Sequence, residues 1–466
     1  MTRSALTYHL RPAALAAALT LAGCGSLVPP AEGPTAPLRE TFRADSTVAE
    51  PPLADAAAAH EWDGFFVDEQ LRSVVGLALS GNRSLRASVA AVERARALYG
   101  VSEAARWPQL GLTGIVDSER RLGTNYTVSI GVTGWEIDLF DRLGSLQGAA
   151  LARYLEQQET QRGTRLTLVA EVAQAWLALA AERQRLRLAV ELRESQRRTL
   201  DLAERQYRLG AASGLQRARA QTAFEAARGE AARSAAAVTQ AQLALELLVG
   251  QPLPESLLPS AQGTAATALP DLPAELPATV LLQRPDLRAA EQSLQAAAFD
   301  VGAARAARFP RLTLTAAAGR RNSQLDGLFQ GGSSFWTLLP RLDVPIFDAG
   351  ARRAQVDASE ATRREALALY DAALQSAFRE VADALAVRDS LTERLAAQQA
   401  QVDAAERSRL LAETSYRLGG ASQLELLDAQ RELASAQQGL VTLRQTEQSN
   451  RVVLLRALGG RWTAAS

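Results

Sequence analysis

The sequence is poor in the residues from which most reactive protein sites are built. It has one cysteine, Cys24, and two histidines among 466 residues. A single cysteine excludes an intramolecular disulfide, and two histidines supply few ligands for a metal centre and few bases for catalysis. Neither a glycine-rich phosphate loop nor a G-x-S-x-G nucleophile motif is present. We therefore expect no enzymatic activity, no metal site and no cofactor.

The sequence also lacks an excess of charge of either sign. Its 51 Lys and Arg balance 51 Asp and Glu, which excludes a bulk electrostatic attraction to a polyanion such as nucleic acid. Alanine, arginine, leucine, glutamine and glutamate dominate long stretches instead. That composition is typical of long helices.

The N-terminus has the pattern of a secretory signal. Arg3 and Arg11 precede the short apolar run AALAAALTLAG, which is too short to cross about 30 Å of hydrocarbon. The following LAGC, Leu21–Cys24, is similar to a bacterial lipobox. We therefore predict a signal peptide over 1–23 and lipid attachment at Cys24. The alternative is an ordinary signal with an incidental cysteine. Beyond it, 24–59 is rich in Pro, Gly and Ala and is predicted to be an extended tether.

The chain carries an internal duplication. YRLGAASGLQRARAQ, Tyr207–Gln221, matches YRLGGASQLELLDAQ, Tyr416–Gln430, without a gap. Asn82–Leu110 matches Arg284–Leu312 in the same way, with Trp107-Pro108 opposite Phe309-Pro310. The predicted organisation is therefore a first repeat over 60–250, a Pro-rich linker over 251–281, a second repeat over 282–462 and a tail over 463–466.

Each repeat predicts the same succession of elements. A helix of about 35 residues ends before an aromatic-Pro pair. Two alternating runs follow, and then a very long helix extends to Gly210 in one repeat and to Gly419 in the other. The first long helix would measure roughly 100 Å at about 1.5 Å per residue. Its apolar residues are spaced by three and four, which is typical of a coiled coil. For the helices alone, a purely structural coiled coil stays the alternative.

The alternating runs predict strands at about 109–117, 126–135, 311–319 and 336–344. In YTVSIGVTGW, Val128, Ile130 and Val132 share one face, and Leu314 occupies an apolar face in the second repeat. Runs of 9–10 residues match the length of a tilted strand that crosses a bilayer, and aromatic residues cluster at their ends. We therefore expect these residues to face lipid. A small soluble sheet that caps a coiled coil is the alternative.

Four strands cannot close a sheet in lipid, because the polar groups of each free edge would stay unpaired. Copies of the chain must then complete it. Two copies give eight strands, whose interior side chains fill, whereas three copies give twelve. Small inward residues such as Thr127, Ser129, Gly131 and Thr133 suit an open lumen. Three chains are favoured.

Four stretches resemble one known family. They are DLPAELPATVLLQRPDLRAAE (Asp271–Glu291), WEIDLFDRLG (Trp135–Gly144), VPIFDAG (Val344–Gly350) and Tyr416–Gln430. The chain is similar to TolC-type outer-membrane efflux factors, of the lipoprotein branch that includes OprM and NodT-like proteins, over Cys24–Trp462. The resemblance implies a mainly α protein with membrane β: long coiled-coil hairpins and four barrel strands per chain, in a trimeric 12-stranded β-barrel on an α-helical periplasmic tube.

The same resemblance implies the function. The protein would be a passive trimeric conduit, the outer-membrane channel component of a tripartite efflux system, lipid-anchored in the outer membrane with a long periplasmic extension. It would carry small molecules from an inner-membrane pump of the RND type, through a periplasmic adaptor. A lipid-anchored periplasmic coiled-coil adaptor or structural protein is the alternative function.

The resemblance also assigns a periplasmic gate to the second repeat. Leu424 corresponds to the family's apolar gate residue, and Glu425 and Asp428 correspond to its acidic ring. The first repeat has Gln216 and Arg219 at these two acidic positions, so it is not assigned to the ring. A solvated helix face is the alternative for Glu425 and Asp428.

Overall fold

The computed structural model describes residues 27–30, 33, 41–43, 64–120, 123–261, 267 and 275–460. Long helices account for most of the described chain, and a four-stranded sheet accounts for most of its strands. The chain forms two compact units, and each draws on both repeats. Unit 1 contains Val89–Thr160 and Arg288–Ala373 with the N-terminal residues, and unit 2 contains Pro37–Ser88, Gln161–Leu287 and Leu374–Ser466. The two repeats are therefore not two separate compact bodies.

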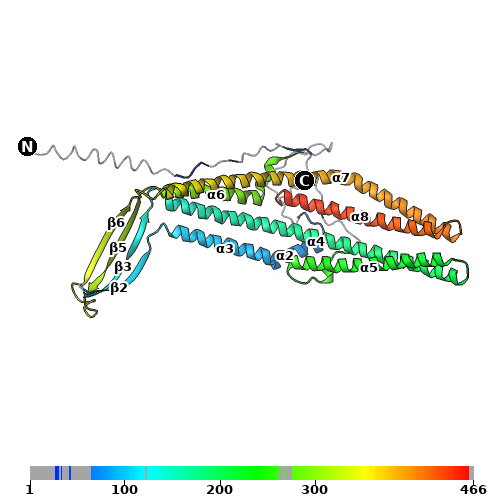
Figure 1. Cartoon of the computed structure of the whole chain (residues 1–466), viewed down its shortest axis with the longest axis horizontal. Coiled ribbons are helices and arrows are strands. Elements are labelled where there is room, and N and C mark those ends of the chain that lie inside the picture. Colours follow the sequence, from blue (N-terminus) through cyan, green and yellow to red (C-terminus); the bar gives the residue numbers. More distant parts are fainter. Residues whose placement is uncertain are drawn as a thin grey trace, which may run out of the picture. The chain divides into compact units, whose positions relative to one another are not determined.

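The sheet belongs to unit 1. It is antiparallel in the order β2-β3-β5-β6 (Figure 1). The strands are β2 (Leu110–Glu119), β3 (Gly123–Ile137), β5 (Arg311–Asn322) and β6 (Ser334–Asp343). Each overlaps one of the four strands predicted from the alternating runs, and β3 is longer than predicted by a few residues at each end.

The register of the strands sorts their side chains onto two faces. Ile130 is opposite Leu112 of β2 and Ala318 of β5. Because directly opposite residues lie on the same face, these three share an apolar face. The same face continues with Val132, opposite Leu110 and Ala316, and with Trp135, opposite Leu314. Ser129, opposite Thr113 and Gly319, lies on the other face, where small residues prevail.

The outer strands of this sheet, β2 and β6, each have a side without a partner among the described strands. Pro340 lies in β6 opposite Leu314. Proline cannot donate to a strand ladder and is tolerated in an edge strand, so the sheet accommodates it. Both edge strands expose large apolar side chains in the single chain, as Leu112 (76%) and Trp336 (78%) illustrate.

Two aspartates hold the corners at which strands pass into the long helices of unit 1. Asp138 accepts hydrogen bonds from the backbone N–H groups of Arg142 (2.7 Å) and Gly144 (2.9 Å), at the start of α4 (Arg142–Arg208). Asp348 accepts one from Arg352 N–H (3.2 Å) at the start of α7 (Ala351–Arg417). These carboxylates satisfy helix N–H groups that have no partner inside the helix. The other helices of this unit are α3 (Arg83–Ala104), of which the residues from Val89 onward belong to it, and α6 (Pro285–Ala306).

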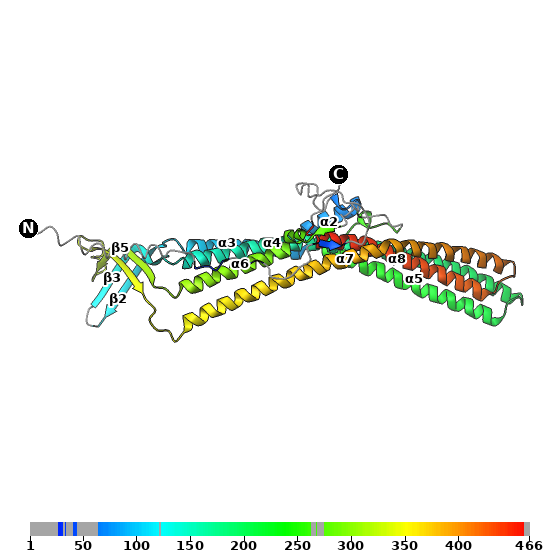
Figure 2. The ribbon, with the colours of Figure 1, turned by 90° about the horizontal axis from the view of Figure 1, so that it is seen from above.

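Unit 2 contains two helical hairpins. The second part of α4 turns back into α5 (Gly214–Val249), and the second part of α7 turns back into α8 (Gln423–Ala457). Both views show each returning helix beside its partner (Figures 1 and 2). Between α7 and α8 the contact is apolar, with a buried cluster of Val402, Ala405, Leu433, Ala436 and Leu440. With 67 residues, α4 and α7 are each about 100 Å long.

The single helix predicted before Pro108 is divided in two, so that expectation was wrong in detail. α2 (Glu69–Gly81) ends before Asn82 and α3 begins after it. The backbone of Asn82 is extended, and its side chain accepts from Leu85 N–H. Asn82 Nδ2 also donates to the carbonyl of Leu248, at the end of α5 (2.8 Å). A Cβ on Gly81 would lie 2.4 Å from the Val249 carbonyl oxygen. The break is therefore fixed by close packing on a distant helix, which local periodicity does not reveal.

The linker between the repeats is partly structured. Its described residues include the short 3-10 helices η2 (Glu255–Leu257) and η3 (Ala278–Gln283). They also include a strand β4 (Glu275–Pro277) that pairs with β1 (Thr41–Arg43) of the predicted tether. The buried Arg284 follows it and donates to Asp286, to Glu380 of α7 (2.9 Å) and to the Ala457 carbonyl of α8 (2.9 Å). This arginine ties the linker to the second hairpin.

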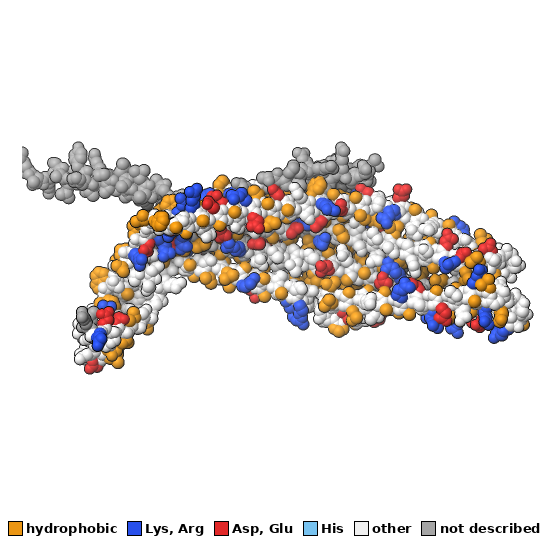
Figure 3. Space-filling model, in the orientation of Figure 1, with side chains coloured by type: hydrophobic (Ala, Val, Ile, Leu, Met, Phe, Trp, Pro, Cys, Tyr) orange, Lys and Arg blue, Asp and Glu red, His pale blue; other side chains and the backbone are white. Residues whose placement is uncertain are grey.

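On the face seen in Figure 3, positive and negative side chains alternate along the helices without a large patch of one sign. Among the described residues, no helix is both long enough and apolar enough to cross a membrane.

Candidate functional site: the hairpin tips

The two hairpins of unit 2 turn by the same local geometry. Gly210 (φ 72°) and Gly419 (φ 79°) have left-handed backbone conformations, which glycine adopts without the steric cost that other residues incur. At each tip a backbone N–H just beyond the helix donates a hydrogen bond to a carbonyl in its last turns. Ala211 N–H donates to the Gln206 carbonyl and Gly420 N–H to the Ser415 carbonyl, both at 2.8 Å. These bonds end α4 and α7 as the repeated YRLG predicts.

The helix that follows each tip begins with a capping box. Ser213 Oγ accepts from Gln216 N–H (3.2 Å), and Gln216 Oε1 accepts from Ser213 N–H (2.7 Å). Ser422 Oγ accepts from Glu425 N–H (3.3 Å), and Glu425 Oε2 accepts from Ser422 N–H (2.6 Å). Gln216 and Glu425 therefore perform the same local task. The pattern S-x-x-E/Q, present in both copies, is the signal that could have predicted these boxes from the sequence.

The three predicted gate residues lie in the first two turns of α8, on the side that faces away from the chain's own core. Leu424 is 45% exposed, and Glu425 and Asp428 are exposed. Asp428 accepts a salt bridge from Arg431, one turn further along. Arg431 was not among the predicted site residues, although its i, i+3 spacing from Asp428 is visible in the sequence.

The opposite side of α8 packs on α4 through a polar layer. Gln196 Nε2 donates to Gln430 Oε1 (2.9 Å), and Gln430 Nε2 donates to Ser195 Oγ (3.3 Å). Gln196 and Gln430 are 2% and 6% exposed. Near the tip, Gln423 is 4% exposed. The orientation of α8 is therefore fixed by burial of this side, which leaves Leu424, Glu425 and Asp428 outward.

Aromatic contacts distinguish the two tips. In the first, the guanidinium of Arg217 lies 4.5 Å from the centre of the Tyr207 ring, a cation–π arrangement. In the second, the hydroxyl of Tyr416 donates to Gln206 Oε1 of α4 (3.4 Å). Arg219, exposed on α5, occupies the position that corresponds to Asp428. The tips therefore share their fold but present different charges.

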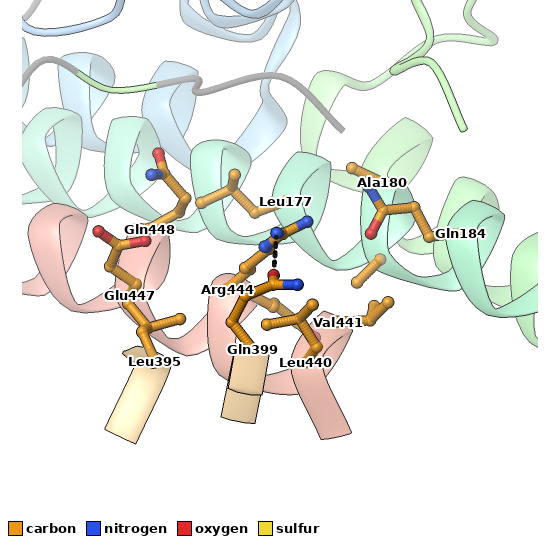
Figure 4. A pocket seen from close by; sticks show the side chains of 12 residues that line it. Leu177, Ala180, Gln184, Leu395, Gln399, Leu440, Val441, Arg444, Glu447 and Gln448 are labelled. Carbon is orange, nitrogen blue, oxygen red and sulfur yellow. Dashed lines mark hydrogen bonds between the residues drawn. The ribbon is translucent and has the colours of Figure 1, made fainter. Parts of the chain in front are cut away.

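Further along the hairpins from the tips, α4, α7 and α8 line an open depression of about 430 Å³ (Figure 4). Leu177, Leu440 and Val441 contribute apolar surface, and a hydrogen bond from Arg444 to Gln399 (3.1 Å) crosses it.

No group of three or more His, Cys, Asp or Glu side chains among the described residues is arranged to hold a metal ion. Cys24, the predicted lipidation site, lies outside the described residues.

Comparison with known families decides the identity of the chain. The profile of the family described as "Outer membrane efflux protein" matches residues 74–251 and 276–460. The chain belongs to the outer membrane efflux protein family. The two matched segments run close to the bounds of the two predicted repeats, and they contain both hairpin tips.

Characterised relatives and solved structures agree with this assignment. The toluene efflux pump outer membrane protein TtgF of Pseudomonas putida is 38% identical over 466 residues, covering 96% of each chain. The outer membrane protein OprJ of Pseudomonas aeruginosa is 36% identical over 460 residues, covering 96% of this chain and 95% of OprJ. The structure of a Pseudomonas aeruginosa membrane protein is 35% identical with a TM-score of 0.87, over 93% of this chain and 100% of the other.

The open state of the MtrE outer membrane channel of Neisseria gonorrhoeae, at 31% identity, has a TM-score of 0.84 over 93% of this chain and 98% of that channel. The predicted family and fold class are therefore confirmed, and so is the predicted function as an efflux channel of the outer membrane. The family consists of transport conduits rather than enzymes. The alternative of a periplasmic adaptor is not supported.

Proposed function

We propose that three copies of the chain close one barrel and one helical tube, anchored in the outer membrane through an acylated Cys24. The two unpaired edges of the sheet, β2 and β6, support this proposal. Each would pair with the opposite edge of a neighbouring copy, because an open edge in lipid costs several kcal/mol for each unpaired polar group. The apolar face around Ile130 would then contact lipid, and the face around Ser129 would line the lumen.

The periplasmic entrance of this conduit is formed, in our proposal, by Leu424, Glu425 and Asp428 of each copy. The observation that carries it is the comparison of the two capping boxes. Gln216 closes the first box as completely as Glu425 closes the second, so the cap does not require the carboxylate of Glu425. The carboxylate of Glu425 therefore adds a negative charge that the capping box itself does not need, and its exposed position supports a ring of carboxylates around the axis of the trimer.

Such a ring would attract cations, because like charges at a narrow opening focus the field there. Arg431 reduces the net charge of the ring through its salt bridge with Asp428. Leu424 would close the opening by packing against its copies. As partners we propose a periplasmic adaptor that contacts the outer surface of the tips and an inner-membrane pump of the RND class, since the relative TtgF is named as part of an efflux pump.

Planar-bilayer recordings on the purified trimer test the gate. Glu425→Gln keeps the capping geometry that Gln216 has in the first repeat, but removes the charge. With Asp428→Asn added, we expect the cation preference to fall while the fold is kept. Leu424→Ala is expected to raise the conductance.

The matched control is Gln216→Ala, which removes a capping side chain of the first tip without removing a charge. It is expected to leave ion selectivity unchanged. If Glu425→Gln with Asp428→Asn leaves the cation preference as it is in the wild type, the two carboxylates form only a solvated helix face.

A further inference from the structure

Residues 27–30, close to the predicted lipidation site, do not extend freely from the helices. They lie against α6 and α7 in unit 1. Arg305 Nη1 of α6 donates to the Leu27 carbonyl (3.3 Å), and Arg363 Nη2 of α7 donates to the Pro30 carbonyl (3.2 Å). Between these two bonds, Pro29 is buried, whereas Pro30 is exposed. Two helices therefore hold four consecutive residues that the sequence assigned to a tether.

A glycine in α6 makes room for this segment. A Cβ on Gly302 would lie 2.6 Å from Val28 Cγ2 and 3.2 Å from Val28 Cα, with Ser145 Oγ of α4 at 3.0 Å on another side. Any larger residue at 302 must therefore displace the segment. Glycine inside a helix costs about 0.5–1 kcal/mol relative to alanine, and this close approach supplies the packing reason for its presence.

The arginine beside Gly302 is oriented by its neighbours. Arg305 Nη2 donates to Glu360 Oε1 of α7 (2.9 Å), so one guanidinium bridges α6, α7 and the N-terminal segment. The same hydrogen bond and charge lower the pKa of the Glu360 carboxyl, which keeps the pair ionised at neutral pH. Arg305 lies in the last turn of α6, and β5 begins at Arg311. The docking site is therefore close to the end of the sheet at which strands meet helices.

We propose that this docking site sets the position of the lipid anchor relative to the sheet. The proposal rests on acylation of Cys24, which is part of the proposed function. Leu27 is the third residue after Cys24, so at most about 11 Å of extended chain lies between their Cα atoms. The acyl chain is thereby held beside the strand ends, where the apolar face of the sheet begins. In a free tether, by contrast, the anchor would reach any point within the length of 24–59.

The docking is tested with single-cysteine chains. Cys24→Ser removes the only cysteine, and Pro29→Cys or Pro30→Cys is then added. In the folded protein in detergent, maleimide labelling at 29 should be slower than at the neighbouring 30 by about tenfold or more, because the buried position reacts only after local opening. Equal rates at the two positions would show that the segment is not docked.

Gly302→Leu tests the close approach of Val28 to Gly302. It should bring the labelling rate at 29 close to that at 30, since the leucine displaces Val28. Gly100→Leu is the matched control, because a Cβ at this helical glycine meets nothing within 4 Å, and it should leave the protection at 29 unchanged. Protection that survives Gly302→Leu, or that is lost equally in Gly100→Leu, overturns the role given to Gly302.

The anchoring role is tested with Cys24 intact. Gly302→Leu should retain palmitate labelling but form heat-resistant trimers more slowly, whereas Gly100→Leu should assemble at the wild-type rate. An unchanged assembly rate in Gly302→Leu overturns the positioning of the anchor. Absence of palmitate labelling in the wild-type chain overturns the lipid anchor itself, and the cysteine protection then reports separately on the docking.

Discussion

Arginine placed at Ile130 is the sharpest test of which sheet face contacts lipid. The sequence pattern identified Val128, Ile130 and Val132 as one apolar face, and the register distinguishes among them. Ile130 has Leu112 and Ala318 as its direct neighbours, whereas Val128 is opposite Arg320. Arg320 in turn donates to the Gln330 carbonyl in the β5–β6 loop. Val128 therefore lies nearer the loop end of the sheet, and Ile130 lies deeper.

The depth of the substituted side chain in the bilayer decides how much an arginine destabilises the protein. Arginine near the middle of a bilayer costs about 2–4 kcal/mol on the lipid-facing side of a barrel, and about 0–1 kcal/mol near its boundary. We expect the larger value for Ile130→Arg and the smaller one for Val128→Arg. Ser129→Arg, on the opposite face between them, should cost little because its side chain would enter the aqueous lumen.

Urea unfolding of protein reconstituted in lipid vesicles measures these costs. The chain contains 6 tryptophans, whose fluorescence reports the transition, and linear extrapolation gives the free energy of unfolding. The three variants place the same residue at neighbouring positions of one strand, so each controls for the others. Equal destabilisation by Ile130→Arg and Ser129→Arg would refute the assignment of faces.

Three further predictions follow from other parts of the chain. Cys24→Ser should abolish palmitate labelling while part of the protein still reaches the outer membrane, and continued labelling of the mutant would exclude Cys24 as the acylated residue. Ser422→Ala and Ser213→Ala should each destabilise their helix start by about 1 kcal/mol, visible as faster amide hydrogen exchange at the tips; no change at either tip would contradict the capping boxes. Burial raises the pKa of Asp286, but its bonds with Arg284 more than offset that effect and hold the pKa below its ordinary value. The stabilisation by the Arg284–Asp286 pair should therefore be present above about pH 4 and be lost as the pH falls further. Asp286→Asn should make thermal stability less sensitive to acid. An unchanged pH dependence of the thermal stability in this variant would argue against the pair.

Local pattern was sufficient for much of the fold. The alternation of Tyr126–Trp135 predicted β3, because a strand with one apolar face must place such residues at every second position. Gly210 and Gly419 predicted the ends of α4 and α7, since a left-handed residue stops a helix wherever it occurs. The outward position of Leu424, Glu425 and Asp428 is consistent with the predicted gate, whose role stays a prediction.

Contacts between distant segments could not be derived in this way. The break at Asn82 depends on the Leu248 carbonyl, and the docking of Val28 depends on the absence of a side chain at Gly302. In both cases a residue near the N-terminus contacts a helix far along the chain. The periodicity of a segment carries no information about which distant helix that segment contacts.

Cross-linking between the two sheet edges tests the trimeric conduit most directly. In the Cys24→Ser background, Thr113→Cys places a thiol on β2 and Thr337→Cys places one on β6, both on the face that would line the lumen. A bis-maleimide of about 10 Å, applied to outer membranes, should join β2 of one copy to β6 of the next. A closed trimer should give a ladder of covalent products that ends at three chains, with no ladder from either single-cysteine variant. A ladder that continues beyond three chains, or monomers alone, would contradict it.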